Sequence, residues 1–364
     1  YMLTRRRGGL QREGAALDAT TERVIENFQG NRDTVAILEQ MIGAGRIHHT
    51  MLFAGPAGVG KATLARRFAA ALLGGAEKIQ KDDLSSPENQ AMLAEREKLP
   101  SDKRNDDPLL LSSHPDFVTF PPDGPLRQIS IQQIRLLKDR AQLKPLRGEW
   151  RVFLIDGVDR ANEQAANSLL KTLEEPPAHL ILILTAQNPY DLLPTIRSRA
   201  VQFQLGRLPD DDMRAFARAR GMTAIERRLP LAAGSPGLAV SLDIETYDRR
   251  REAMFKLLEV GAGAAPFSEW VKHSEYISAR KTEKLDYYLD VLYVLLEDLL
   301  LVQNKGEGVR NPDLRPRLES LAGRVSFDWL RSAVRKVDDL TELLRRNIQK
   351  AIALDAFALE LRSV

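Results

Sequence analysis

Residues 55–62, Gly55-Pro56-Ala57-Gly58-Val59-Gly60-Lys61-Ala62, decide the fold of this chain. They follow a short apolar run at residues 50–53 and precede residues 63–73, which have helical periodicity. A strand, a glycine-rich loop and a helix in this order form a phosphate-binding loop, where backbone N–H groups, the helix N-terminus and the lysine face an anion. The candidate nucleotide-binding residues are Gly55, Gly58, Gly60, Lys61 and Thr63.

Two positions needed for nucleotide hydrolysis carry the wrong residues. The residue after the loop lysine normally supplies a hydroxyl that binds Mg²⁺, and here it is Ala62. The residue after Asp156, where ATPases of this type place a catalytic glutamate, is Gly157. The loop can therefore hold ATP or ADP, with Mg²⁺ only alongside a nucleotide, but the parts for hydrolysis are missing. Whether nucleotide is bound stays open at this point.

The acid at the end of the next predicted strand has two interpretations. Residues 151–155 predict a buried strand that ends in Asp156, and an acid in this place is the usual ligand of the metal ion. Asp156 could equally cap the turn into Gly157. Asp159 lies three residues farther on, where a turn or helix-cap role is favoured over that of a substitute base.

The composition restricts the class of protein. A chain of 364 residues is long enough for two or three domains, and a net charge of +3 does not by itself indicate nucleic acid. The absence of cysteine excludes disulfides and thiolate zinc sites, and the five histidines show no metal-site spacing. The longest apolar run, at 291–302, is interrupted by two acids, and no signal peptide is recognisable. These features predict a cytoplasmic protein without membrane contact.

The order of predicted elements indicates an α/β domain followed by helices. Strands are predicted at 117–120, 152–155, 180–185 and 201–203, with helices at 129–143 and 162–173 between them, which favours a parallel sheet. We expect a flexible tail at 1–23, an α/β nucleotide-binding-type domain at 24–207 with a charged insertion at 74–113, a small helical lid at 208–242 and a helical domain at 243–364.

One arginine stands at the rim of the predicted α/β domain. Arg199 closes the run Leu193-Pro194-Thr195-Ile196-Arg197-Ser198-Arg199-Ala200, between a predicted helix end and the last strand. An arginine in this place is usually solvated or paired with a carboxylate. In a ring ATPase, the same place offers a cation to the γ-phosphate of the neighbouring subunit.

Several motifs together resemble the AAA+ subunits of clamp loaders. The longest is Asn167-Ser168-Leu169-Leu170-Lys171-Thr172-Leu173-Glu174-Glu175-Pro176-Pro177, and Arg46-Ile47-His48-His49, His114-Pro115-Asp116 and Arg197-Ser198-Arg199 are similar too. Gly234-Ser235-Pro236-Gly237 is similar to the delta-prime type of subunit in the bacterial DNA polymerase III clamp loader. The resemblance covers residues 24–242 by motif. It implies an AAA+ core, a helical lid and a C-terminal collar domain that assembles a five-subunit ring.

The resemblance also implies a function. A delta-prime-like subunit would be a non-hydrolysing stator, a part of the DNA polymerase holoenzyme that helps ATP-driven loading of the sliding clamp onto primed DNA. Arg199 would act on ATP held by a neighbouring gamma/tau subunit, delta would be a second partner, and the clamp and primer-template DNA would be met through the assembly. Gly237 stands where motor subunits carry a nucleotide-sensing arginine.

Two departures from the family pattern stand out. The four-cysteine zinc module that usually follows the phosphate-loop helix is absent, so no zinc is expected, and Ala200 replaces the cysteine after the trans-acting arginine. The alternatives are an ATP-hydrolysing gamma/tau-like motor with relaxed motifs and a stand-alone nucleotide-binding switch.

Overall fold

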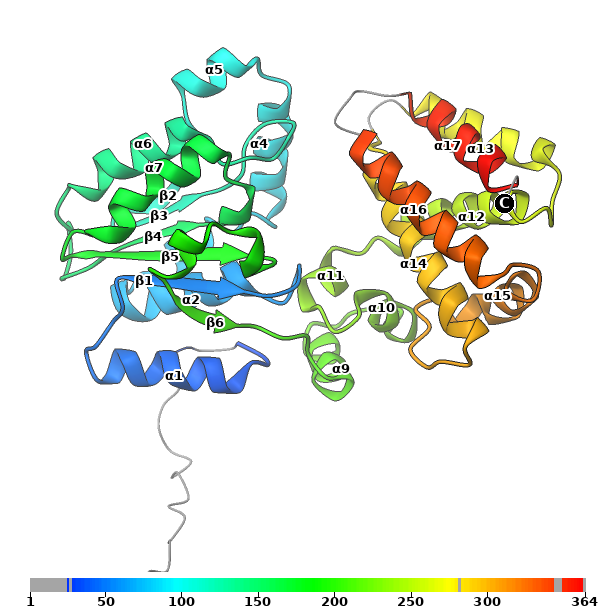
Figure 1. Cartoon of the computed structure of the whole chain (residues 1–364). Helices are drawn as coiled ribbons and strands as arrows, with labels where there is room; N and C mark the ends of the chain where they lie inside the picture. The colour runs from blue at the N-terminus through cyan, green and yellow to red at the C-terminus, as the bar shows by residue number, and fades with distance from the viewer. Residues whose placement is uncertain (1–24, 26–27, 281–282, 344–348, 363–364) are drawn as a thin grey trace, which may run out of the picture.

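The structure, a computed structural model, describes residues 25, 28–280, 283–343 and 349–362. An α/β unit built on a six-stranded sheet comes first, a group of three short helices follows, and a bundle of longer helices ends the chain (Figure 1). The tail expected at residues 1–23 lies outside the described residues.

Five parallel strands and one antiparallel edge strand form the sheet, in the order β2-β3-β4-β5-β1-β6. The strands β1, β4 and β5 are buried along their whole length, as their apolar sequences predict. Their bounds are Thr50–Ala54 (β1), Leu111–His114 (β2), Phe117–Phe120 (β3), Arg151–Ile155 (β4), Leu180–Ala186 (β5) and Val201–Gln204 (β6).

The edge strand β2 was not among the predicted strands, and it is the antiparallel member of the otherwise parallel sheet. It lies at the end of the segment expected to be a charged insertion, and it pairs antiparallel with β3. The short apolar run Leu109-Leu110-Leu111 ends at the first residue of the strand, and the next two residues, Ser112 and Ser113, are exposed serines, so the pattern within β2 does not signal a strand.

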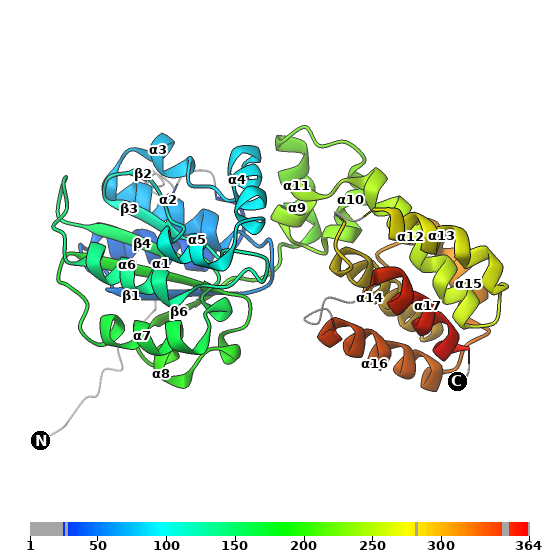
Figure 2. The same cartoon turned by 90° about the horizontal axis from the view of Figure 1, so that it is seen from above.

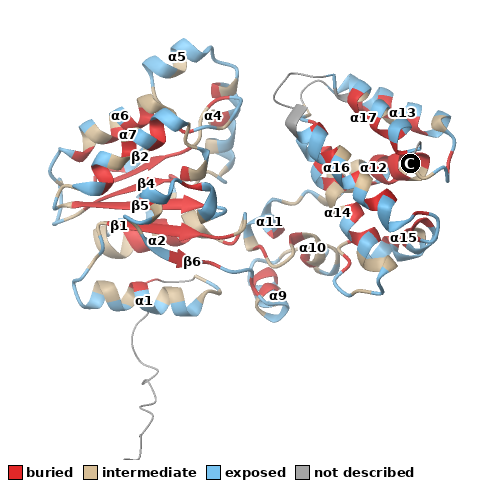
Figure 3. Cartoon of the chain, viewed as in Figure 1, coloured by how far each residue is buried: buried red, intermediate tan, exposed pale blue. Residues whose placement is uncertain are grey.

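Helices cover both faces of the sheet, which makes a three-layer unit (Figures 1 and 3). One apolar cluster joins the helices α1 (Arg32–Gly43) and α2 (Lys61–Leu73) to the sheet, and a second joins α6 (Ile131–Ala141) and α7 (Glu163–Glu174) to the opposite face. Successive strand residues feed the two clusters alternately: Leu52 belongs to one, and Met51 and Phe53 to the other.

The charged segment after α2 is organised around a buried arginine. It forms the helices α3 (Ala76–Gln80), α4 (Pro87–Glu97) and α5 (Ser101–Asp106). The Arg96 guanidinium pairs with the carboxylates of Asp123 at 2.8 Å and Asp107 at 3.3 Å. The Arg96 side chain is itself largely buried, and its ion pairs hold this segment against the α/β unit.

Three short helices follow the sheet and share a small apolar core. They are α9 (Asp210–Ala219), α10 (Ile225–Ala232) and α11 (Pro236–Ser241), and we call them the lid. Leu208, just before α9, and buried side chains of the three helices form one cluster: Leu208, Met213, Ala217, Leu229, Ala232 and Ala239.

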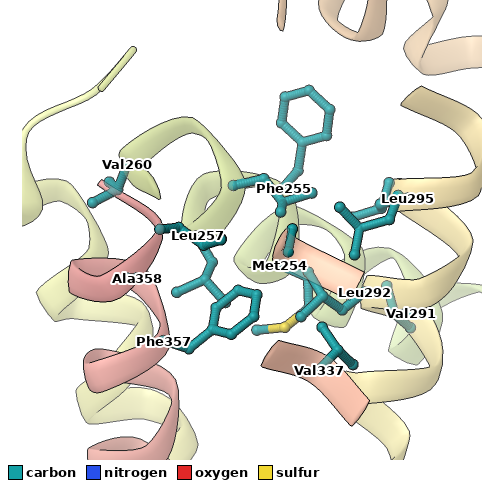
Figure 4. Packing of buried hydrophobic residues seen from close by; sticks show 14 of the residues in the cluster. Met254, Phe255, Leu257, Val260, Val291, Leu292, Leu295, Val337, Phe357 and Ala358 are labelled. Atoms are coloured by element: carbon teal, nitrogen blue, oxygen red, sulfur yellow. The ribbon is translucent and has the colours of Figure 1, made fainter. Parts of the chain in front are cut away.

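The remaining helices form a bundle with its own core. Buried side chains of α12 (Ile244–Gly261), α14 (Asp286–Gln303), α16 (Phe327–Leu343) and α17 (Lys350–Leu361) meet there (Figure 4), and α13 (Phe267–Ala279) and α15 (Arg315–Ala322) complete the bundle. The buried Asp298 interrupts the apolar sequence of α14 because its carboxylate accepts the backbone N–H groups of Arg310 and Asn311 at 2.7 and 3.0 Å. Among the described residues, no helix is long and apolar enough to cross a membrane.

Candidate nucleotide-binding site and the rim arginine

The phosphate-binding loop has the backbone geometry that its glycines predict. Gly55, Gly58 and Gly60 have φ values of +148°, +75° and +99°, which residues with side chains rarely adopt. A Cβ atom on Gly55 would lie 2.1 Å from the carbonyl oxygen of Leu205. The loop thus joins the carboxyl end of β1 to the first turn of α2, where the half-buried Ala62 and Thr63 follow Lys61.

The side chain of the loop lysine, Lys61, is bonded to the backbone of its own loop. Its Nζ donates hydrogen bonds to the carbonyl oxygens of Gly55 at 2.6 Å and Pro56 at 2.7 Å. Burial lowers the pKa of Lys61, and the carboxylates of Asp156 and Asp159 oppose this shift. A bound phosphate would have to replace these carbonyl contacts before Lys61 could bond to it.

Asp156 sits at the end of β4 in a short network of hydrogen bonds. Its Oδ1 accepts the hydroxyl of Thr185 at 2.6 Å, and that hydroxyl accepts the N–H of Gly157 at 2.8 Å. The Asp159 carboxylate accepts the backbone N–H of Gln187 at 2.9 Å. A contact of this kind is typical of the turn role expected for Asp159. Thr185 is not among the residues predicted for the site, although its place at the end of a predicted parallel strand could have signalled it.

Gly157 has a backbone that disfavours the missing glutamate. Its φ of +79° lies in the left-handed region. A side chain there would be strained even though the space around the position is open to 3.5 Å. Restoring a glutamate at position 157 would therefore require the turn after β4 to change.

The lid packs directly on the loop. The N–H of Gly237, in the first turn of α11, donates to the carbonyl oxygen of Gly58 at 2.8 Å. A Cβ atom on Gly237 would lie 3.0 Å from both the Cα and the carbonyl oxygen of Gly58. A Cβ atom on Gly60 would lie 3.0 Å from the ring of Phe28, which was not among the predicted site residues.

A cleft of about 390 Å³ lies beside the loop. It is bounded by the ends of β4 and β5 and by α4 of the charged segment, and it has charges of both signs. Its charged residues are Lys61, Arg127, Arg160, Asp156 and Asp159. In the described part of the chain, no three His, Asp or Glu side chains come together in a way that could hold a metal ion.

Arg199 lies far from this cleft. It follows the short helix α8 (Pro194–Arg197) and precedes β6, which runs parallel to β1 with Val201 opposite Met51. Arg199 therefore lies near the amino ends of the strands, whereas the loop leaves β1 at its carboxyl end. The five residues of β1 separate the two levels by roughly 17 Å. The structure does not bring Arg199 and the loop together, so this arginine cannot serve its own cleft.

The Arg199 guanidinium is accessible at the rim. One of its NH groups pairs with the carboxylate of Glu174 at 2.7 Å, and the other donates to the carbonyl oxygen of Thr195 at 2.9 Å. Its side chain keeps 33% of its surface exposed. The nearby Arg197 instead stacks over the ring of Tyr190, with 5.0 Å between the guanidinium carbon and the ring centre.

Comparison with known proteins identifies the family. A family model described as DNA polymerase III, delta subunit, matches residues 30–209. The delta-prime subunit of DNA polymerase III from Pseudomonas aeruginosa is 28% identical over 345 residues, which cover 90% of this chain and 96% of that protein. The chain belongs to the delta-prime family of DNA polymerase III subunits.

Other proteins are similar to this chain over shorter stretches or at lower identity. The delta-prime subunit of Escherichia coli is 28% identical over 236 residues, 64% of this chain and 69% of that protein. A gamma/tau subunit from Mycobacterium tuberculosis is 33% identical over 187 residues, 51% of this chain and 29% of that longer protein. A solved gamma subunit-related protein from Thermotoga maritima is 18% identical, with a TM-score of 0.45 and coverage of 90% of this chain and 98% of that protein.

The resemblance found in the sequence is therefore confirmed. As a member of the delta-prime family, the chain is a clamp-loader subunit of DNA polymerase III with an AAA+ core. The expected fold, an α/β sheet followed by helices, is confirmed as well, and the antiparallel edge strand β2 is an addition to it.

The contact between Gly237 and Gly58 leads to a prediction about the lid. Gly237→Arg is expected to destabilise the protein by about 1–3 kcal/mol, because the new side chain overpacks the loop backbone, and to create no ATPase activity. Urea unfolding and ATP turnover measure the two effects. Val240→Arg on the same helix is the control, since Val240 is exposed. Unchanged stability of Gly237→Arg would contradict the packing described here.

Proposed function

We propose that this chain is a non-hydrolysing stator of the DNA polymerase III clamp loader that supplies Arg199 to the ATPase site of a neighbouring subunit. The observation that carries the proposal is the position of Arg199 at the opposite end of the strands from the loop of its own chain. An exposed guanidinium that cannot reach its own cleft is available to a phosphate on another subunit. Arginine suits this role because its planar donors bond phosphate oxygens in pairs.

The absence of hydrolysis follows from three residues. Ala62 offers no hydroxyl to Mg²⁺, Gly157 has a backbone unsuited to a glutamate, and Gly237 contacts the loop where a sensing arginine would need space. Each change removes a different part of the reaction. We infer that the subunit supports clamp loading without turning over ATP itself.

Nucleotide binding is a separate part of the proposal. Gly55, Gly58, Gly60, Lys61 and Thr63 would hold the phosphates of ATP or ADP, since the loop keeps the backbone of a phosphate site. Asp156 alone is left to hold Mg²⁺, so the metal would bind only together with a nucleotide. No step of the stator function depends on that nucleotide.

ATP turnover by the isolated chain tests the stator against its rival. The rival is a gamma/tau-like motor, and it is favoured by Lys61 and by the similarity to gamma/tau subunits over 187 residues. We expect little or no turnover with or without primed DNA, because the hydrolytic groups are missing. Turnover at about 1 s⁻¹ or faster, the low end of ordinary enzymes, would overturn the stator. A stand-alone switch would bind nucleotide tightly and show no co-elution with other subunits on size exclusion.

The C-terminal bundle is proposed to hold the subunit in its ring, with gamma/tau and delta as partners and the sliding clamp and primer-template DNA reached through the assembly. Apolar side chains remain exposed on its helices, and Phe327, Ile352 and Leu359 each expose more than half of their surface. Exposed apolar side chains contribute to contacts between proteins where they join into a continuous patch.

A shortened chain that ends at Leu242 is expected to lose co-purification with gamma/tau while its α/β unit stays folded. Both apolar clusters of the sheet are built from residues up to Leu205, so the truncation leaves them complete. Pull-down on tagged gamma/tau measures assembly, and circular dichroism of the shortened chain measures folding. Stoichiometric assembly of the shortened chain would show that the bundle is not the oligomerisation domain.

A further inference from the structure

Glu174 holds the rim arginine from a neighbouring helix. It is the last residue of α7, and its carboxylate lies 2.7 Å from an NH group of Arg199, which follows α8. The two residues are 25 positions apart in the sequence, and α7 and α8 lie side by side (Figure 2). The contact therefore depends on the folded α/β unit and not on local chain geometry.

The position of Glu174 is unfavourable for its own helix. The carboxyl end of a helix carries partial negative charge, so a carboxylate in the last turn is disfavoured there. The opposite face of α7 packs on the sheet through Leu169, Thr172 and Leu173, which leaves the Glu174 side chain at the rim. Helix stability does not account for an acid here, whereas the pairing with Arg199 does.

The contacts of Arg199 leave some of its donors available. A guanidinium has five N–H donors, and the described contacts use three: one nitrogen donates to Glu174, and another donates to the Thr195 carbonyl oxygen and, at 3.4 Å, to the Ser198 hydroxyl. Two anchors on different elements fix the plane of the group. The donors that these anchors do not use can meet a phosphate without prior reorientation of the side chain.

We propose that Glu174 is the positioning residue of Arg199, setting its guanidinium for the γ-phosphate of the neighbouring subunit. This role rests on the proposed function of Arg199, because Glu174 would hold the Arg199 guanidinium in place before the reaction. Correct placement of a charged donor before the reaction contributes to rate because no reorientation is needed in the transition state. Both partners are solvent-accessible, so the ion pair is weak and its loss costs a small factor.

The test uses the assembled clamp loader with the clamp and primed DNA, and it compares four versions of this subunit. They are the wild type, Glu174→Ala, Arg199→Ala and the double variant. The quantity compared is the ATPase rate that depends on Arg199, the wild-type rate minus that of Arg199→Ala. Glu175→Ala is the matched control, because this exposed carboxylate is the next residue of the chain. Co-elution on size exclusion confirms that every variant assembles.

We expect Glu174→Ala to lower the Arg199-dependent kcat by about 3- to 10-fold with an unchanged KM for ATP, since the arginine acts in the transition state. The double variant should have the same ATPase rate as Arg199→Ala, because without the arginine Glu174 has no guanidinium to position. Glu174→Gln, which keeps the size and removes the charge, should show a smaller loss of the same kind, and Glu175→Ala none.

Two results would overturn the inference while leaving the proposed function intact. One is wild-type turnover in both Glu174 variants when Arg199→Ala is slow. The other is a double variant slower than Arg199→Ala by the full factor of Glu174→Ala, which would show that Glu174 acts independently of the arginine. Wild-type turnover of Arg199→Ala would instead remove the trans-acting role itself, and the positioning role with it.

Discussion

Replacing Arg199 by alanine is expected to slow ATP-driven clamp loading by the assembled complex severalfold while leaving the fold unchanged. The side chain is partly exposed and makes its described contacts at the rim, so its removal leaves no cavity in either apolar cluster. An arginine supplied to a neighbouring site accelerates GTP hydrolysis by roughly 10³ to 10⁵ in the best-studied cases. The loss for the whole complex should be much smaller, since other sites would keep their own arginines.

Two matched variants separate the role of the guanidinium from that of charge and fold. Arg199→Lys should recover little activity, because lysine keeps the charge but cannot bond phosphate oxygens with a planar fork. The Arg197→Ala variant should load clamps at the wild-type rate, since Arg197 stacks on Tyr190 and takes no part in the pairing of Arg199 with Glu174. Steady-state ATPase and fluorescence-based clamp loading provide the measurement. Normal loading by Arg199→Ala in a fully assembled complex would show that this arginine is only a surface residue.

Gly55→Ala is expected to destabilise the α/β unit by about 3 kcal/mol or more. The new Cβ atom would lie 2.1 Å from the carbonyl oxygen of Leu205, a backbone atom that cannot move without disturbing the end of β6. The residue would also have to keep a φ of +148°. Urea unfolding followed by circular dichroism gives the free energy of unfolding.

Two other glycines separate the clash from the backbone strain. Gly43 ends α1 with nothing within 4 Å of a Cβ atom, so alanine there should be neutral or stabilise by up to about 1 kcal/mol. Gly74 has an open surrounding but a φ of +71°, so alanine there reports strain alone. The difference between the Gly55 and Gly74 variants measures the clash. If these two variants were equally stable, the close approach of β6 to the loop would be wrong.

The sequence predicted the parts of the fold that depend on local pattern. The strands β1, β4 and β5 are continuous apolar runs, and the loop is a motif with fixed spacing, so both could be recognised without a structure. The edge strand β2 could not be recognised, because its exposed serines carry no apolar signal. An edge strand is defined by its neighbour β3 more than by its own residues.

The contacts around the candidate site were less predictable. The glycines and the place of Arg199 at a helix end follow from motif and periodicity. The pairing of Arg199 with Glu174 and the hydrogen bond from Gly237 to Gly58 join residues 25 and 179 positions apart, and they exist only once the helices and the lid have packed. The roles proposed for these residues remain predictions until the variants are measured.

The arginine at the centre of the charged segment has a consequence for how this part of the chain is held together. Arg96 and its two carboxylate partners, Asp107 and Asp123, tie together α4 and the chain on either side of β2 and β3. Removing the Arg96 guanidinium would leave the Asp123 carboxylate buried without this partner, and the same change would release α4 from both flanking pieces of chain. A single side chain thus closes the segment that separates α2 from the edge of the sheet.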